Sequence, residues 1–240
     1  MEWRYHQIKK EKRILSEQPY GGFSQKELTW MIVCIFIATF VTLLPKISTD
    51  PLIILPRLCI ITVIIFFSCI FKKRTAGIHA LKIEHTIWKF SRYWFYESSH
   101  SKKPFPIGLI VPFFIAIFSL GYVQPLTFLQ FESENISSIR LLRARGYKRA
   151  LRKELINEAD LANTSAAGFY ALTLLALFGY ILFKIDILFG FDLAKYAIMY
   201  NLWNMLPVSN LDGTKLFFGS MLQWVFLVVL NVIGLSILFL

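Results

Sequence analysis

Long apolar runs separated by short polar stretches form the main pattern along this chain. A polar and basic stretch covers residues 1–29 and precedes the first run. Because about 20 apolar residues suffice for a helix to cross the hydrocarbon core of a bilayer, each later run predicts a transmembrane or re-entrant segment. The predicted segments cover about residues 30–45, 52–72, 107–128, 166–184, 187–206 and 221–240.

The run at 107–128 differs from the others because Gly108, Pro112, Gly121 and Pro125 interrupt it. Such breaks suit either a kinked span or a re-entrant hairpin that is packed inside protein. Positive-inside reasoning places the basic loop that follows on the same side as Lys72–Arg74. This favours the re-entrant alternative, although the pattern leaves both open.

Residues 75–103 mix charged, histidine and aromatic side chains, which predicts an interfacial helix with its aromatic rings at the head-group level. On such a helix, His79 and His85 are expected to be interfacial polar residues, and Glu84 a solvated charge.

The composition supports a membrane location. Hydrophobic residues make up 56% of the chain and charged residues only 17%, which is more apolar surface than one soluble domain can bury. We therefore expect an all-α polytopic membrane protein with about five or six transmembrane or re-entrant segments. A basic N-terminal surface segment, 1–29, would precede a single transmembrane domain, 30–240.

The net charge of +11 would suggest nucleic-acid binding in a soluble protein. Beside membrane spans, basic residues instead hold topology and contact anionic lipid head groups, so we predict no nucleic-acid partner. The loop at 139–158 fits an amphipathic surface helix that contacts lipid or a partner protein. Its basic residues are Arg140, Arg143, Arg145, Lys148, Arg149, Arg152 and Lys153.

An ionisable residue follows the fifth apolar run, where the chain should still be at membrane depth. Pro207 breaks the run, and Asp212 and Gly213 come five and six residues later. An acidic residue inside a membrane is costly and indicates a functional site by default. The alternative is a plain loop between two spans, with Asp212 solvated at the surface. Residue chemistry alone does not decide between the two.

The motif Asn204-x-x-Pro207-x-x-x-Leu211-Asp212-Gly213 resembles the second signature of the site-2 protease family of intramembrane zinc metallopeptidases. Phe23–Leu28, Leu120–Pro125 and Asp160–Asn163 are similar, in the same order, to other stretches of short archaeal-type members. The resemblance implies a site-2-protease-like core with Asn163 and the motif residues at its groove. It implies that Asp212 would be a zinc ligand if a metal is bound.

The other signature of that family, HExxH, is absent from the sequence. Its two histidines lie at i and i+4 on one helix face, and its glutamate is the general base. If the second apolar run is the equivalent helix, its end reads Ser68-Cys69-Ile70-Phe71-Lys72, without His or Glu. If a helix at 79–90 is equivalent, neither His79 nor His85 begins such a motif. Catalytic zinc normally takes three protein ligands. We therefore expect no catalytic residues and no cofactor. Zinc is the one metal that the motif would still allow, but we do not expect it to be bound.

Three functions remain open. The first is a catalytically degenerate site-2-protease-like protein that binds a transmembrane helix or serves as a subunit of a membrane complex. The second is an active intramembrane zinc protease with rearranged ligands, using Asp212 with His79 or His85. The third is an unrelated structural subunit of an energy-converting or translocating complex. The expected location is an archaeal-type plasma membrane or an organellar membrane, with lipid and other membrane proteins as partners.

Overall fold

The computed structural model describes residues 22–44, 51–79, 81–89, 105–135 and 158–240. The predicted basic loop, from Arg140 to Lys153, and most of the predicted N-terminal surface segment lie outside the described residues. The described helices are α2 (Gln25–Leu43), α3 (Pro51–Ile78), α4 (Ile107–Phe118), α6 (Glu158–Lys184), α7 (Gly190–Asn204), α8 (Asp212–Gly219) and α9 (Met221–Phe239). Two strands, β1 (Leu81–Ile87) and β2 (Leu129–Asn135), complete the described part.

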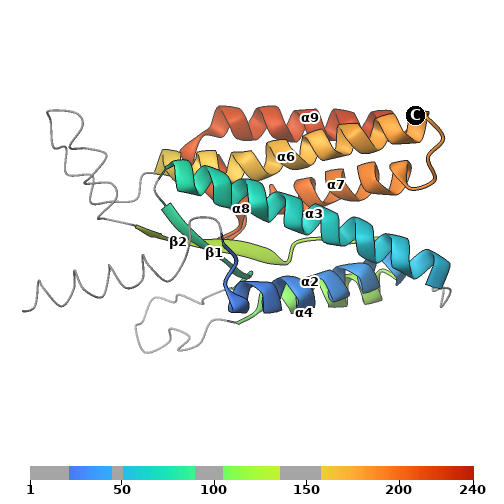
Figure 1. The fold of residues 1–240 in the computed structure, drawn as a ribbon, viewed down its shortest axis with the longest axis horizontal. Helices are drawn as coiled ribbons and strands as arrows, with labels where there is room; N and C mark the ends of the chain where they lie inside the picture. The colour runs from blue at the N-terminus through green and yellow to red at the C-terminus, as the bar shows by residue number, and fades with distance from the viewer. Residues whose placement is uncertain (1–21, 45–50, 80, 90–104, 136–157) are drawn as a thin grey trace, which may run out of the picture.

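The long helices run roughly along one axis in two groups. Helices α3, α6, α7 and α9 lie on one side, α2 and α4 on the other, and the two strands lie between them toward one end (Figure 1). Helix α6 packs against α3, α7 and α8 and is therefore the centre of the bundle.

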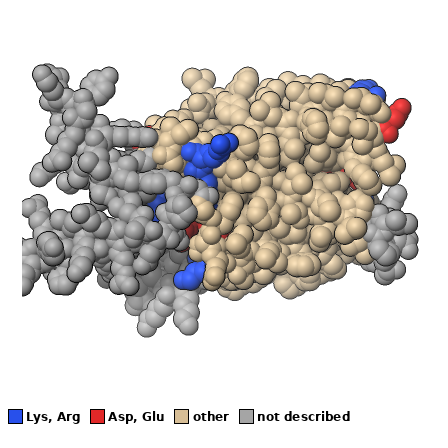
Figure 2. All heavy atoms as spheres, in the orientation of Figure 1, with Lys and Arg blue, Asp and Glu red and all other residues tan. Residues whose placement is uncertain are grey.

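Four helices are long and apolar enough to cross a bilayer: α2, the Ile54–Ile78 part of α3, α6 and α9. On the face shown in Figure 2, charged side chains lie toward the two ends, with a broad uncharged belt between them. Both observations agree with the predicted membrane protein. The predicted segment at 187–206 is shorter than expected, since α7 spans only 15 residues.

Close helix packing in the bundle depends on small residues, as transmembrane interfaces generally do. A Cβ atom added to Gly179 on α6 would lie 2.7 Å from the backbone nitrogen of Ala194 on α7. Nearby, the Asn201 amide donates to the Phe169 carbonyl and to Asn231 Oδ1, both at 3.1 Å. This buried amide pair joins α6, α7 and α9 by hydrogen bonds.

The two ends of the broken segment at 107–128 lie beside the same residue, Trp88. The Gly108 N–H donates to the Trp88 carbonyl at 2.9 Å, and the Trp88 N–H donates to the Phe128 carbonyl at 2.8 Å. Helix α4, with 12 residues, is only about 18 Å long, which is too short for a hydrocarbon core of about 30 Å. Leu120 and Gly121, with φ of 50° and 81°, reverse the chain. The described segment is therefore a hairpin that begins and ends beside Trp88.

The prediction of an interfacial helix at 75–103 is wrong for the residues that the structure describes in this range. Helix α3 continues to Ile78, and residues 81–87 form strand β1, which pairs antiparallel with β2. Burial alternates along β1, with Leu81, Ile83, His85 and Ile87 inside, as the two-residue period of a strand requires. His85 is 1% exposed, so its expected interfacial position is also wrong. Glu84 is a strand residue opposite Glu132, not a helix charge.

Candidate functional site

Asp212 lies inside the protein at the first position of α8. The connection from α7 passes through an exposed Pro207 and a Ser209 with a φ of 54°, and Leu211 then caps α8. Asp212 is 1% exposed. Of the two alternatives left open by the sequence, the solvated surface loop is therefore excluded. The N-terminal end of a helix also favours a negative charge at this position.

Two further motif residues fix this turn. Asn204 donates to the Leu126 carbonyl at 3.0 Å and to the Tyr200 carbonyl at 2.8 Å, which ties the end of α7 to the chain that follows α4. A Cβ atom added to Gly213 would lie 2.7 Å from the Asn204 carbonyl oxygen and closer still to that of Met205. Only glycine allows α8 to begin this close to the end of α7.

A buried lysine neutralises Asp212. Lys72 Nζ on α3 lies 2.5 Å from Asp212 Oδ2, and the two side chains are 4% and 2% exposed. Gly168 on α6 makes room for this lysine, because a Cβ atom there would overlap the Lys72 side chain. Each ion of such a pair requires the other, because either one alone would be a buried charge without a partner.

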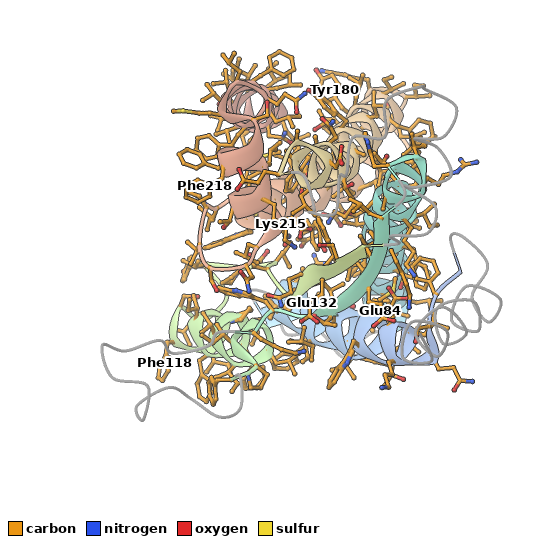
Figure 3. All side chains as sticks on the ribbon, turned by 90° about the vertical axis from the view of Figure 1, so that its left-hand side faces the viewer. Glu84, Phe118, Glu132, Tyr180, Lys215 and Phe218 are labelled. Carbon is orange, nitrogen blue, oxygen red and sulfur yellow. The ribbon has the colours of Figure 1, made fainter. Side chains whose placement is uncertain are left out.

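A second lysine approaches the same carboxylate from α8. Lys215 Nζ is 3.8 Å from Asp212 Oδ1 and donates to the Phe131 carbonyl of β2. Figure 3 shows Lys215 between the bundle and the strands, while Glu84 and Glu132 lie together on the strands below it. Asp212 is thus the meeting point of α3, α8 and the two-stranded sheet.

These contacts shift the protonation equilibria of the α8 residues. Burial raises the pKa of Asp212, but Lys72 and then Lys215 outweigh it and hold this pKa below its ordinary value. Burial lowers the pKa of Lys215 to about 8, with Asp212 opposing part of the change. Near neutral pH, Asp212 is therefore ionised, whereas Lys215 is closer to losing its proton than an ordinary lysine.

A second buried cluster surrounds Glu27 at the start of α2. Its carboxylate accepts hydrogen bonds from the Ser24 N–H at 2.7 Å, from Lys73 Nζ at 2.5 Å and from the His85 N–H at 2.7 Å. The ring nitrogen His85 Nδ1 lies 3.2 Å from Glu27 Oε1. Glu27 therefore links α2, the end of α3 and strand β1.

The other ring nitrogen of His85, Nε2, is buried without a hydrogen-bond partner. Burial lowers the pKa of His85, but Cys69 and the hydrogen bond to Glu27 raise it above its ordinary value.

Sequence reasoning missed most of the charged residues in these two clusters. The sequence pattern predicts that Lys72 and Lys73 are flanking charges that set topology, yet they are only 3% and 8% exposed. The signal that could have found them is their place inside a 28-residue helix. Asn163 is half-buried on α6, and no hydrogen bond in the described part of the chain links it to Asp212. His79 lies 3.3 Å from Asp160 and thus belongs to another contact.

Within the described residues, no group of three His, Cys, Asp or Glu side chains is arranged to hold a metal ion. Ser68 and Lys72 lie four residues apart on α3, so they share one helix face, and the buried Ser68 hydroxyl has no hydrogen-bond partner. Compared with protein-family models, with curated proteins and with solved structures, the chain matches none of them.

Proposed function

We propose that this protein is a site-2-protease-like membrane protein that has lost hydrolysis and binds a transmembrane helix or another membrane partner. The observation that carries the proposal is the buried contact of 2.5 Å between Lys72 and Asp212. This contact joins the end of the second apolar helix to the aspartate of the motif. The resemblance implies that the helix with HExxH would lie against this aspartate, because both would bind the same zinc ion.

The positions correspond residue by residue. Ser68, Cys69 and Lys72 occupy the places of the first histidine, the glutamate and the second histidine of HExxH. The Lys72 ammonium group then lies where the resemblance would put the zinc ion. An ammonium group supplies the positive charge that a buried carboxylate needs, but it has no open coordination position for water. In this proposal the Lys72–Asp212 pair stabilises the scaffold without a bound metal ion, and the hydrolysis that a metal ion would support is lost.

A gain-of-function experiment tests this correspondence. The triple variant Ser68→His, Cys69→Glu, Lys72→His should bind about one zinc per chain, measured by elemental mass spectrometry of the detergent-purified protein. Adding Asp212→Ala to the triple variant is the matched control and should abolish binding. A triple variant that folds as the unmodified chain does, yet binds no zinc, would show that the correspondence is wrong.

The same measurement on the unmodified chain separates this proposal from an active protease with rearranged ligands. The specific support for that second candidate is that Asp212 Oδ1 and His85 Nε2 are both buried without hydrogen bonds. Against it, Lys72 already forms an ion pair with the Asp212 carboxylate, and its positive charge would repel a metal ion. About one zinc per unmodified chain, lost in Asp212→Ala, would favour the second candidate and overturn the first.

The partner side of the proposal needs its own test. Photo-crosslinking from the exposed apolar face of α9, for example at Leu222 or Phe226, should capture a specific membrane protein in native membranes. Purification from native membranes in mild detergent as a lone polypeptide, with crosslinks only to lipid, would contradict both a bound helix and a subunit role.

A further inference from the structure

Two basic side chains lie at the end of the bundle opposite Lys72 and Lys215, where α2 ends and α3 and α7 begin (Figure 1). Arg57 belongs to the part of α3 that can cross a bilayer, and Lys195 lies on α7. Within the described part of the chain, neither forms an ion pair with a carboxylate. A charge in a membrane segment is costly and normally has a partner, so these two cations indicate a site for an anion.

The two basic groups lie against the same aromatic ring. Arg57 Cζ is 5.8 Å and Lys195 Nζ 5.6 Å from the centre of the Tyr196 ring, as in cation–π contacts. Tyr196 is 2% exposed, whereas Arg57 and Lys195 are half-buried. The buried ring therefore holds both cations at one place, while part of each basic side chain stays accessible to a ligand.

A hydrogen bond to α2 fixes the depth of Arg57. Its Nη1 donates to the Thr42 carbonyl at 2.5 Å, and Thr42 lies in the last turn of α2. The guanidinium group is thus at the level where α2 ends. A guanidinium group has five N–H donors, and the described residues accept only this one hydrogen bond from it. The remaining donors form the planar fork that binds phosphate oxygens.

The surroundings distinguish a lipid from a soluble anion. Leu55, two residues before Arg57, is 63% exposed, and Phe239, whose ring centre is 6.0 Å from Lys195 Nζ, is 62% exposed. Acyl chains would cover these apolar side chains, whereas free phosphate would not. Asp192 precedes Lys195 by three residues on α7, and this one carboxylate beside two cations leaves the site positively charged.

We propose that Arg57 and Lys195 form a binding site for the head-group phosphate of an anionic phospholipid in the leaflet at this end of the bundle. Arg57 donates hydrogen bonds to the phosphate, Lys195 supplies the second positive charge, and Tyr196 positions both, as basic pockets between membrane helices do for anionic head groups. A zwitterionic lipid binds more weakly, because the two cations repel its ammonium group. The site lies at the other end of the bundle from the Lys72–Asp212 pair and does not depend on the proposed function.

Photoreactive lipids test the site in the full chain. The protein is reconstituted in phosphatidylcholine vesicles with a trace of phosphatidylglycerol that carries a diazirine near its glycerol, and crosslinked peptides are mapped by mass spectrometry. A phosphatidylcholine with the same diazirine is the lipid control. At the peptides that contain Arg57 and Lys195, we expect phosphatidylglycerol to crosslink at least about fivefold more than phosphatidylcholine, the preference that one basic residue near the membrane surface provides.

Variants assign the preference to these residues. Arg57→Gln and Lys195→Gln should each lower phosphatidylglycerol crosslinking at this end about fivefold, without changing crosslinks at the other end of the bundle in the same sample. Arg57→Lys keeps the charge but not the fork and should lose less than Arg57→Gln. Lys184→Gln is the matched control, because Lys184 is an exposed lysine in the last turn of α6, against the Tyr180 ring at 5.5 Å. It should leave the crosslinking unchanged.

Equal crosslinking of the two lipids at this end of the unmodified chain would overturn the proposal even if no variant folds. An unchanged phosphatidylglycerol signal in a folded Arg57→Gln variant would also overturn it. So would a loss in Lys184→Gln as large as that in Arg57→Gln, since the preference would then come from the general charge of this end.

Discussion

Breaking the buried ion pair should cost this protein a large part of its stability. Lys72→Met leaves Asp212 with Lys215, 3.8 Å away, as its remaining lysine partner among the described residues, so we expect the lower end of the roughly 3–5 kcal/mol range for removing one partner of a buried pair. Asp212→Asn leaves two ammonium groups without their carboxylate and should reach the upper end of about 3–5 kcal/mol.

The double variant Lys72→Met, Asp212→Leu should lose less than the sum of the two single losses, because it leaves neither Lys72 nor Asp212 stranded. The assay is unfolding by SDS in mixed micelles, analysed as a double-mutant cycle. Lys82→Met is the control, since Lys82 and Glu84 form a partly exposed pair at 3.9 Å that should contribute less than about 1 kcal/mol. Additive losses, or a Lys72→Met loss as small as the control, would refute the reasoning.

Three other predictions follow from the packing and from the charges. Gly213→Ala should destabilise the protein by about 1–3 kcal/mol, seen as a lower thermal midpoint, because its Cβ would overlap the Met205 carbonyl. Asn231→Leu should cost about 1 kcal/mol in SDS unfolding, since it leaves the buried Asn201 amide without one acceptor. The pKa of Lys215 is about 8 when folded, against 10.5 ordinarily. Between these values the unfolded chain binds more protons, so the free energy of unfolding should rise with pH. Lys215→Met should lack that rise in a pH series of unfolding curves.

The sequence predicted the elements that depend on local pattern. Continuous apolar runs predict long helices, and the glycines and prolines from Gly108 to Pro125 predict a break in the membrane segment. The structure has both, with α4 returning at Gly121. The proline break is compatible with a buried Asp212 and with a solvated one. The sequence does not decide between them, because a local pattern does not show which residues cover a loop.

The parts that failed depend on contacts between distant residues. The sequence predicts a helix where strand β1 lies, because the polar His85 occupies an inward position of the two-residue alternation and interrupts its apolar pattern. The partners of Glu27 lie 46 and 58 residues away, and no periodicity records such pairs. Lysines at the end of an apolar helix resemble topology signals, and only the fold shows that two of them are buried.

The distance in sequence between Lys72 and Asp212 has a consequence for biosynthesis. The two residues are 140 positions apart, and at about 5–20 residues per second a ribosome needs roughly 7–28 seconds to cover that distance. Throughout that interval the chain carries a lysine whose carboxylate partner has not yet been made. Until then its long side chain must reach toward the head groups. Chains that terminate before α8 are therefore expected to keep a mobile, shallowly inserted α3 and to be the preferred targets of membrane quality control.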